Sequence, residues 1–165
     1  MPRSIYIDCE WYIGGDIFLI GWAYSARSQG QLYDASLTQS KFMRLLEGVS
    51  YIYFYGPDVG VIERHWKIRL RDKYICINIL KVFKHHFHSN SYKLAHIEKL
   101  FGIHRQEAEY KKSVFMIWHD WKHPQRKQRL LKYNREDVIN MMRLWIRVRN
   151  HFGIQNEYLL QEKLK

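Results

Sequence analysis

The segment Ser4-Ile-Tyr-Ile-Asp-Cys-Glu-Trp11 combines a short apolar run with two carboxylates, Asp8 and Glu10. Its β-branched and aromatic residues predict a β-strand over residues 4–9. Side chains two positions apart in a strand point to the same side, so Asp8 and Glu10 share one face. Adjacent carboxylates repel each other unless a cation lies between them. The end of this strand is therefore a candidate metal site.

The rest of the chain predicts an alternation of strands and helices. Two further strands, at 17–24 and about 31–34, follow Gly14-Gly15 and a turn over 25–30, which is typical of an antiparallel meander. The later segments predict a capped helix from 36–38 to 48, a strand at 51–55, a helix at 58–70, a strand at 74–77, and helices at 79–87, 91–101, 114–121 and 124–150, the last as one helix or a pair. We expect an α/β fold with a mixed five-stranded sheet, an antiparallel three-strand meander plus two parallel strands, flanked by helices.

Composition indicates one ordered domain over residues 1–165. Hydrophobic residues make up 47% of the 165 residues and aromatic residues 16%, which is enough to build a core and excludes bulk disorder. No stretch approaches the roughly 18 apolar residues of a membrane helix, so we expect neither membrane insertion nor secretion. Cys9 and Cys76 lie in apolar runs, as buried free thiols do in a reducing compartment. These features predict a cytoplasmic protein.

The formal charge of +11 is unevenly distributed. Residues 1–60 carry four basic and six acidic side chains, whereas residues 61–165 carry 23 basic and ten acidic ones. Lys and Arg contacts to phosphates release condensed counterions, so a basic body favours a nucleic-acid partner. The alternative is a protein that is basic only for solubility.

Two further carboxylates stand in distant segments. Asp58 opens the helix after the fourth strand, and Asp137 lies four residues after Tyr133, on the same helical face. We expect these groups to converge with Asp8 and Glu10 where the first strand ends. An oxygen-rich set without a Cys or His ligand suits Mg²⁺ or Mn²⁺ and argues against Zn²⁺.

In a basic protein, such a set predicts metal-assisted attack on phosphodiesters. Two divalent ions about 4 Å apart activate a water and stabilise the attacking and leaving oxygens. Tyr133 is expected to position this water and not to act as its base, because an ordinary Tyr has a pKa of about 10.

Basic and aromatic side chains adjoin these carboxylates. The densest basic run leads into Tyr133 and consists of Lys122, Arg126, Lys127, Arg129 and Lys132. We favour phosphate contact by this run over a merely solvated helix face. Trp11 and Tyr12 directly follow the acidic pair, where an aromatic ring either stacks on a terminal base or supports the sheet.

Two of these motifs carry a resemblance to a known family. Ile7-Asp-Cys-Glu-Trp11 resembles the first motif of the DEDD exonucleases of the ribonuclease H-like superfamily, and Tyr133-Asn-Arg-Glu-Asp137 resembles their third motif in its Tyr-x-x-x-Asp form, the DEDDy subgroup. Lys132 stands five residues before Asp137, which disfavours the His-containing subgroup. Residues 91–103 and 113–118 resemble the connecting helices of predicted ribonuclease H-like exonucleases. The resemblance implies a ribonuclease H-like fold and a 3′–5′ exonuclease with two divalent ions, acting on single-stranded DNA or RNA or on frayed ends.

The second motif departs from the family pattern. Many members carry Asn four residues before the Asp, where this chain has Phe54, and Gly56-Pro57 precedes Asp58. Asp58 is therefore either a metal ligand or a helix N-cap. Two alternatives to an exonuclease stay open: a nucleic-acid-binding module that no longer cuts, and an endonuclease of the ribonuclease H or junction-resolving type, against which the spacing of Tyr133 speaks. The sequence does not determine whether the substrate is DNA or RNA, nor does it determine the oligomeric state.

Overall fold

A five-stranded sheet lies at the centre of the protein. The structure, a computed structural model, describes residues 3–106 and 114–163. The strand order is β3-β2-β1-β4-β5, with antiparallel β1–β2 and β2–β3 pairs and parallel β1–β4 and β4–β5 pairs. The strands are β1 (Arg3–Trp11), β2 (Ile17–Ser25), β3 (Ser28–Tyr33), β4 (Val49–Phe54) and β5 (Ile75–Asn78). The predicted α/β class with a mixed sheet is confirmed.

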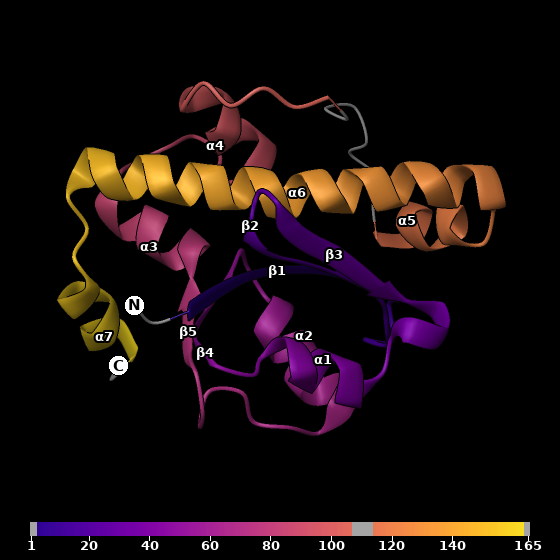
Figure 1. The fold of residues 1–165 in the computed structure, drawn as a ribbon. Helices are drawn as coiled ribbons and strands as arrows, with labels where there is room; N and C mark the ends of the chain where they lie inside the picture. The colour runs from indigo at the N-terminus through magenta and orange to yellow at the C-terminus, as the bar shows by residue number, and fades with distance from the viewer. Residues whose placement is uncertain (1–2, 107–113, 164–165) are drawn as a thin grey trace.

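Helices cover both faces of the sheet (Figure 1). The longest, α6 (Pro124–Phe152), crosses one face, and α1 (Gln39–Leu45) and α2 (Asp58–Trp66) lie on the other. The remaining helices are α3 (Ile79–His86), α4 (Leu94–Leu100), α5 (Val114–Trp121), α7 (Asn156–Lys163) and the 3₁₀ helix Asp34–Ser36. α4 and α5 both contact α6, so the long helix organises this face.

Alternation along β1 decides which way the two carboxylates point. Ile5, Ile7 and Cys9 belong to the core on the α1/α2 side, whereas Tyr6 belongs to the core beneath α6. Because side chains alternate along a strand, Asp8 and Glu10 fall on the face of Tyr6 and hence under α6. The sequence pattern of one strand thus places its acidic pair opposite the long helix.

Several predicted boundaries differ from the structure. The β2–β3 hairpin is tighter than the predicted 25–30 turn, because Ser25 pairs with Ser28 and its hydroxyl accepts hydrogen bonds from the amides of Arg27 and Ser28. α2 ends at Trp66 and not near residue 70, because Lys67 adopts a left-handed φ of 52°. Beyond it, Glu63 accepts hydrogen bonds from two amides of the next loop, which fixes a non-helical path.

The last part of the chain also differs. α4 begins at Leu94, three residues later than predicted, α6 is one uninterrupted helix, and α7 was not predicted. α6 ends where Gly153 adopts a left-handed φ of 62°. Within the described ranges, no helix combines the length and the apolar character that a bilayer crossing needs. Neither Cys9 nor Cys76 forms a disulfide with another described residue; Cys9 is buried, as predicted, whereas Cys76 is only half-buried.

Candidate functional site

Three of the four predicted carboxylates meet at one point. Asp8 and Glu10 extend from β1, and Asp137 extends toward them from α6. One oxygen from each lies within 4.8 Å of one from each of the others. An all-oxygen set of this size, assembled from two elements, fits a hard divalent cation.

The close approach of α6 to the sheet depends on Gly21. This residue lies opposite Asp8 in the β1–β2 ladder. A Cβ atom at Gly21 would lie 2.3 Å from Oδ1 of Asn134 and 2.8 Å from Cγ2 of Val138. Because real side chains do not approach so closely, only glycine lets α6 settle at this depth.

Asn134 connects α6 to the acidic pair. Its Nδ2 donates to Oδ2 of Asp8 at 2.8 Å and to the carbonyl oxygen of Asp8 at 3.3 Å. Its Oδ1 accepts from Nε2 of Gln31 in β3 at 2.9 Å, and the same Nε2 donates to the carbonyl of Leu131 at 2.8 Å. This hydrogen-bond chain, buried at Asn134, fixes the orientation of the Asp8 carboxylate.

A buried ion-pair network holds Asp137 from the other side. Nε and Nη2 of Arg105 each lie 2.7 Å from the Glu98 carboxylate, and Nη2 lies 2.5 Å from Oδ1 of Asp137. The guanidinium also sits 5.4 Å from the centre of the Tyr133 ring. Arg105 therefore bridges α4 and the site-facing side of α6.

Asp58 takes a different position from the other three carboxylates. Its Oδ1 accepts from the backbone amide of Cys9 at 3.0 Å and from the Cys9 thiol at 3.2 Å. The last β1–β4 pair is Tyr6 with Tyr53, so the Cys9 amide lies beyond the part of β1 that pairs with β4. This amide donates to the Asp58 side chain and not to a β4 carbonyl. The N-cap of α2 is Pro57, so the N-cap alternative for Asp58 is wrong.

Two hydrogen bonds from one side chain hold the loop before Asp58. The Asn78 side chain at the end of β5 accepts from the Gly56 amide at 3.1 Å and donates to the Gly56 carbonyl at 2.9 Å. Gly56 has a φ of 104°, which favours glycine. Asn78 thus fixes the path of the chain that delivers Asp58 to β1.

The site concentrates negative charge where water has limited access, because Asp137 is buried and Asp8 and Glu10 are half-buried. Burial, followed by the charges of Asp58, Asp137 and Glu10, raises the pKa of Asp8 well above its ordinary value, and burial followed by the charges of Asp137 and Asp58 does the same for the pKa of Glu10. Burial raises the pKa of Asp137 to about 7, an effect that the Arg105 charge opposes. Burial raises the pKa of Asp58 to about 6, against hydrogen bonds from Cys9. A cation would relieve this repulsion.

Tyr133 belongs to the same group. Its side chain hydrogen-bonds Asp137, and burial, together with the charges of Asp137, Glu10 and Asp8, raises its pKa. The phenol therefore stays protonated over the physiological pH range, so it is a hydrogen-bond donor and not a base.

The two aromatic residues after the acidic pair have separate surroundings. Trp11 is half-buried against the core on the α1/α2 side, so its ring supports the sheet. The Tyr12 ring lies on the other side, 4.8 Å from that of Phe18 and 5.7 Å, edge to face, from that of Trp118 in α5. Of the two, Tyr12 is the one that adjoins α5.

The predicted basic run is divided among different surfaces. Lys122 lies over the Trp118 ring at 3.8 Å. Lys127 lies 2.5 Å from Oδ2 of Asp34 and 4.3 Å from the centre of the Trp121 ring, so it ties α6 to the end of β3.

Arg126 and Arg129 line a hollow of about 570 Å³ between α5 and α6, and their spacing puts them on the helical face of Tyr133. Lys132 lies on the outer side of α6.

Sequence reasoning missed the residues that support the carboxylates. The signals for Gly21 and Asn134 were present, because a glycine interrupts an apolar strand and an Asn stands on the apolar stripe that continues through Val138 and Met141. Arg105 and Glu98 gave no such signal, because their pairing with each other and with Asp137 depends on tertiary structure.

Comparison with known proteins agrees with the fold. A family model of the RNase H superfamily matches residues 5–149, which include all the carboxylates described above. A search of curated proteins gives no match to this sequence. The family match spans most of the chain, from β1 into the last turn of α6. The chain therefore belongs to the RNase H superfamily.

Proposed function

We propose that this protein is a divalent-metal-dependent 3′–5′ exonuclease that hydrolyses phosphodiester bonds of single-stranded DNA or RNA. The observation that carries the proposal is the convergence of Asp8, Glu10 and Asp137 beside Tyr133. The fold belongs to a nuclease superfamily, and the Tyr133-x-x-x-Asp137 spacing resembles the exonuclease form of the third motif. Together these favour an exonuclease over other RNase H-like nucleases.

Each residue of the site has a proposed role. Two ions, Mg²⁺ or Mn²⁺, would be held by Asp8, Glu10 and Asp137. Asp58, hydrogen-bonded to the Cys9 amide, would add negative charge near these ligands. Bound divalent ions supply an activated water and stabilise charge on the phosphate oxygens. Tyr133, protonated and hydrogen-bonded to Asp137, orients the attacking water.

Residues beside the site are proposed to hold the strand. Arg126 and Arg129 share the Tyr133 face of α6, so they are placed to contact phosphates that approach the carboxylates. Tyr12 and Trp118 offer ring surfaces at the α5 side, with the Lys122 ammonium nearby. Trp11 and Lys127 are not included in this proposed role, because Trp11 packs on the α1/α2 side of the sheet and Lys127 pairs with Asp34.

The decisive experiment uses the purified full chain with Mn²⁺ and 5′-labelled single strands of DNA and RNA. An exonuclease of the proposed polarity gives 5′-labelled products that shorten progressively, and it leaves a circular single strand intact. Cleavage of the circle would instead identify an endonuclease. No cleavage of any substrate, with binding retained, would identify a non-cleaving module.

Matched variants tie any cleavage to the site. Asp8→Asn removes a charge from the carboxylate cluster with little change in shape and should abolish Mn²⁺-dependent cleavage while leaving strand binding nearly intact. Asp72→Asn removes the same charge from an exposed loop position and should cleave like the wild type. Equal activity of the two variants would overturn the proposed site.

A further inference from the structure

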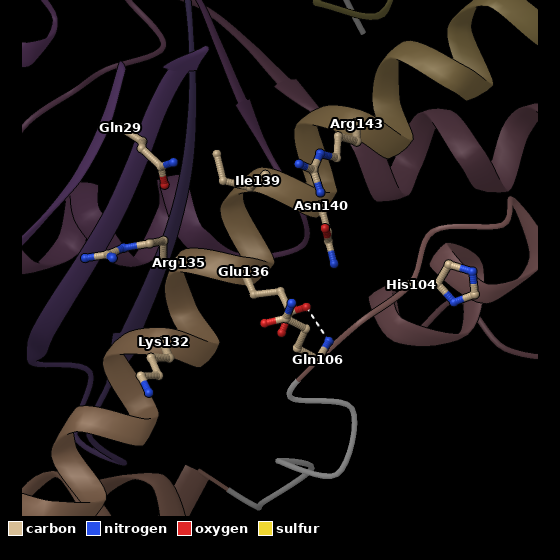
Figure 2. A pocket seen from close by; sticks show the side chains of 9 residues that line it. All are labelled: Gln29, His104, Gln106, Lys132, Arg135, Glu136, Ile139, Asn140 and Arg143. Atoms are coloured by element: carbon tan, nitrogen blue, oxygen red, sulfur yellow. Dashed lines mark hydrogen bonds between the residues drawn. The ribbon is translucent and has the colours of Figure 1, made fainter. Parts of the chain in front are cut away.

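The outer side of α6 carries a pocket separate from the carboxylate cluster. It has a volume of about 320 Å³ and lies between α6, the start of β3 and the chain at residues 104–106 (Figure 2). Gln29 borders it on the β3 side, and His104 and Gln106 border it on the opposite side. None of these residues belongs to the site described above.

The pocket has an excess of positive charge. Lys132, Arg135 and Arg143 line it and are exposed. Among the described residues that border it, Glu136 is the single carboxylate, and its Oε1 accepts a hydrogen bond from the Gln106 amide at 2.5 Å (Figure 2). Three cations around a hollow of this size favour an anionic ligand.

A buried amide faces the same space. Asn140 is 1% exposed, and its Nδ2 has no hydrogen-bond partner within the part of the chain that the structure describes. Figure 2 shows its side chain projecting from α6 toward the space beside His104 and Gln106. Buried amide donors are normally satisfied, so an unpartnered one near Arg143, in a pocket that Lys132 and Arg135 line on the β3 side, points to a ligand with acceptor oxygens (Figure 2).

The pocket adjoins the carboxylates through one short segment. Arg105, which contacts Asp137, stands between His104 and Gln106, which border the pocket. Asn140 follows Asp137 by three residues, about 4.5 Å along the helix axis. The pocket and the carboxylate cluster are therefore linked through residues 104–106 and through one stretch of α6.

We infer that this pocket binds a phosphate group, held by Arg143 and the Asn140 amide, with Lys132 and Arg135 adding positive charge on the β3 side of the pocket. The inference deepens the proposed nuclease function and rests on it, because the phosphate is that of a nucleic-acid strand beside the carboxylates. A free phosphate or a mononucleotide offers the same chemistry, and the experiment separates these sources.

The first test measures strand binding without cleavage. In EDTA, fluorescence anisotropy of a labelled single strand should show that Arg135→Ala/Arg143→Ala weakens binding about tenfold near 0.1 M salt and lowers the slope of log K against log salt by about 1 to 1.5. Arg69→Ala/Lys73→Ala removes the same charge from exposed positions after α2 and should bind within about twofold of the wild type. Wild-type affinity in the pocket variant, or an equal loss in the control, would overturn the inference.

The second test reads the buried amide directly. The Asn140 side-chain amide resonances are assigned by their absence in Asn140→Asp and followed by ¹H–¹⁵N spectroscopy as inorganic phosphate or oligonucleotide is added. Shifts with both ligands assign the pocket to the strand, and shifts with phosphate alone assign it to free phosphate or a mononucleotide. Resonances that move with neither ligand refute the phosphate site.

These results are independent of the cleavage assay. A protein that cleaves with Mn²⁺ but whose pocket variants bind normally loses only the inference about the pocket. A protein that never cleaves, but whose Asn140 amide responds to phosphate, loses the proposed exonuclease activity and keeps the phosphate site.

Discussion

Nη2 of Arg105 lies 2.5 Å from Oδ1 of Asp137 and 2.7 Å from Oε1 of Glu98, so one guanidinium pairs with two buried acids. Glu98 is 0% exposed and Asp137 6% exposed. Burying two carboxylates without this cation would be costly, because ionised groups lose their hydration when they leave water. The Arg105 network is therefore a condition for placing Asp137 at β1.

Replacement of Arg105 by Ala should destabilise the protein by about 3–5 kcal/mol, because the buried charge of Glu98 loses its partner. Urea unfolding followed by circular dichroism measures this change. Arg71→Ala is the matched control, because it breaks an ion pair with Glu63 in which Arg71 is largely exposed and should cost no more than about 1 kcal/mol. Equal losses of unfolding free energy in the two variants would show that burying the Arg105 network adds nothing to the stability of the protein.

Gly21→Ala should separate α6 from the sheet. The new methyl group would overlap Asn134 and the stiff Val138 side chain, which predicts a loss of about 1–3 kcal/mol and a weaker Mn²⁺ site as Asp137 moves from Asp8. Thermal unfolding and Mn²⁺ titration calorimetry measure the two effects. Gly14→Ala meets no atom within 4 Å and should change stability by less than about 0.5 kcal/mol. A Gly21 variant that matches this control would contradict the packing argument.

The sequence predicted four of the five strands closely, because they are apolar runs between glycines and turns, whereas β3 is polar and begins three residues before its predicted start. The spacing also singled out Asp8, Glu10, Tyr133 and Asp137, which the structure brings together. The sequence did not predict α7, whose residues Asn156–Lys163 have little amphipathic pattern. The orientation of Asp58 was also beyond reach, because it depends on the Cys9 amide, 49 residues away in the chain. Contacts between distant segments carry no local periodicity, so they appear only when the fold is known.

Tyr133→Phe should lower kcat by about 10²-fold or more while changing strand affinity little, because the ring remains and only the donor hydroxyl is lost. Single-turnover cleavage with excess protein measures the chemical step, and anisotropy in EDTA measures binding. Because the pKa of Tyr133 is raised, its hydroxyl stays protonated below about pH 9. The pH–rate profiles of the wild type and the Phe variant should therefore have the same shape up to that pH. A variant that cleaves at the wild-type rate would reduce Tyr133 to a packing residue.

Asp58→Asn and Asp58→Ala together separate the charge of this residue from its hydrogen bond. Asn keeps an oxygen for the Cys9 amide and should stay within about 1 kcal/mol of the wild-type stability, whereas Ala leaves that amide without its acceptor and should lose about 1–3 kcal/mol. Both variants should weaken Mn²⁺ binding in calorimetry, because both remove negative charge beside Asp8. Unchanged Mn²⁺ affinity in the Asn variant would make Asp58 a purely structural anchor.

The raised carboxylate pKa values predict an unusual pH dependence of stability in the absence of divalent ions. With pKa values of about 6 for Asp58 and about 7 for Asp137, the folded protein binds more protons than the unfolded chain. Between roughly pH 4 and pH 7 the free energy of unfolding should therefore fall as pH rises. In EDTA the melting temperature should be at least about 3 °C lower near pH 8 than near pH 5.5, the shift that about 1 kcal/mol produces at this size.

Mn²⁺ should reverse this loss near pH 8, where the carboxylates are charged, and have a smaller effect near pH 5.5, where protons compete for them. Asp8→Asn removes one member of the repelling group, so it should flatten the pH dependence in EDTA and reduce the response to Mn²⁺. The difference between this variant and the wild type isolates the contribution of the carboxylate cluster from that of the other ionisable groups. If both proteins show the same pH dependence, the carboxylates do not repel one another in the folded state, and their fit to a cation loses its electrostatic basis.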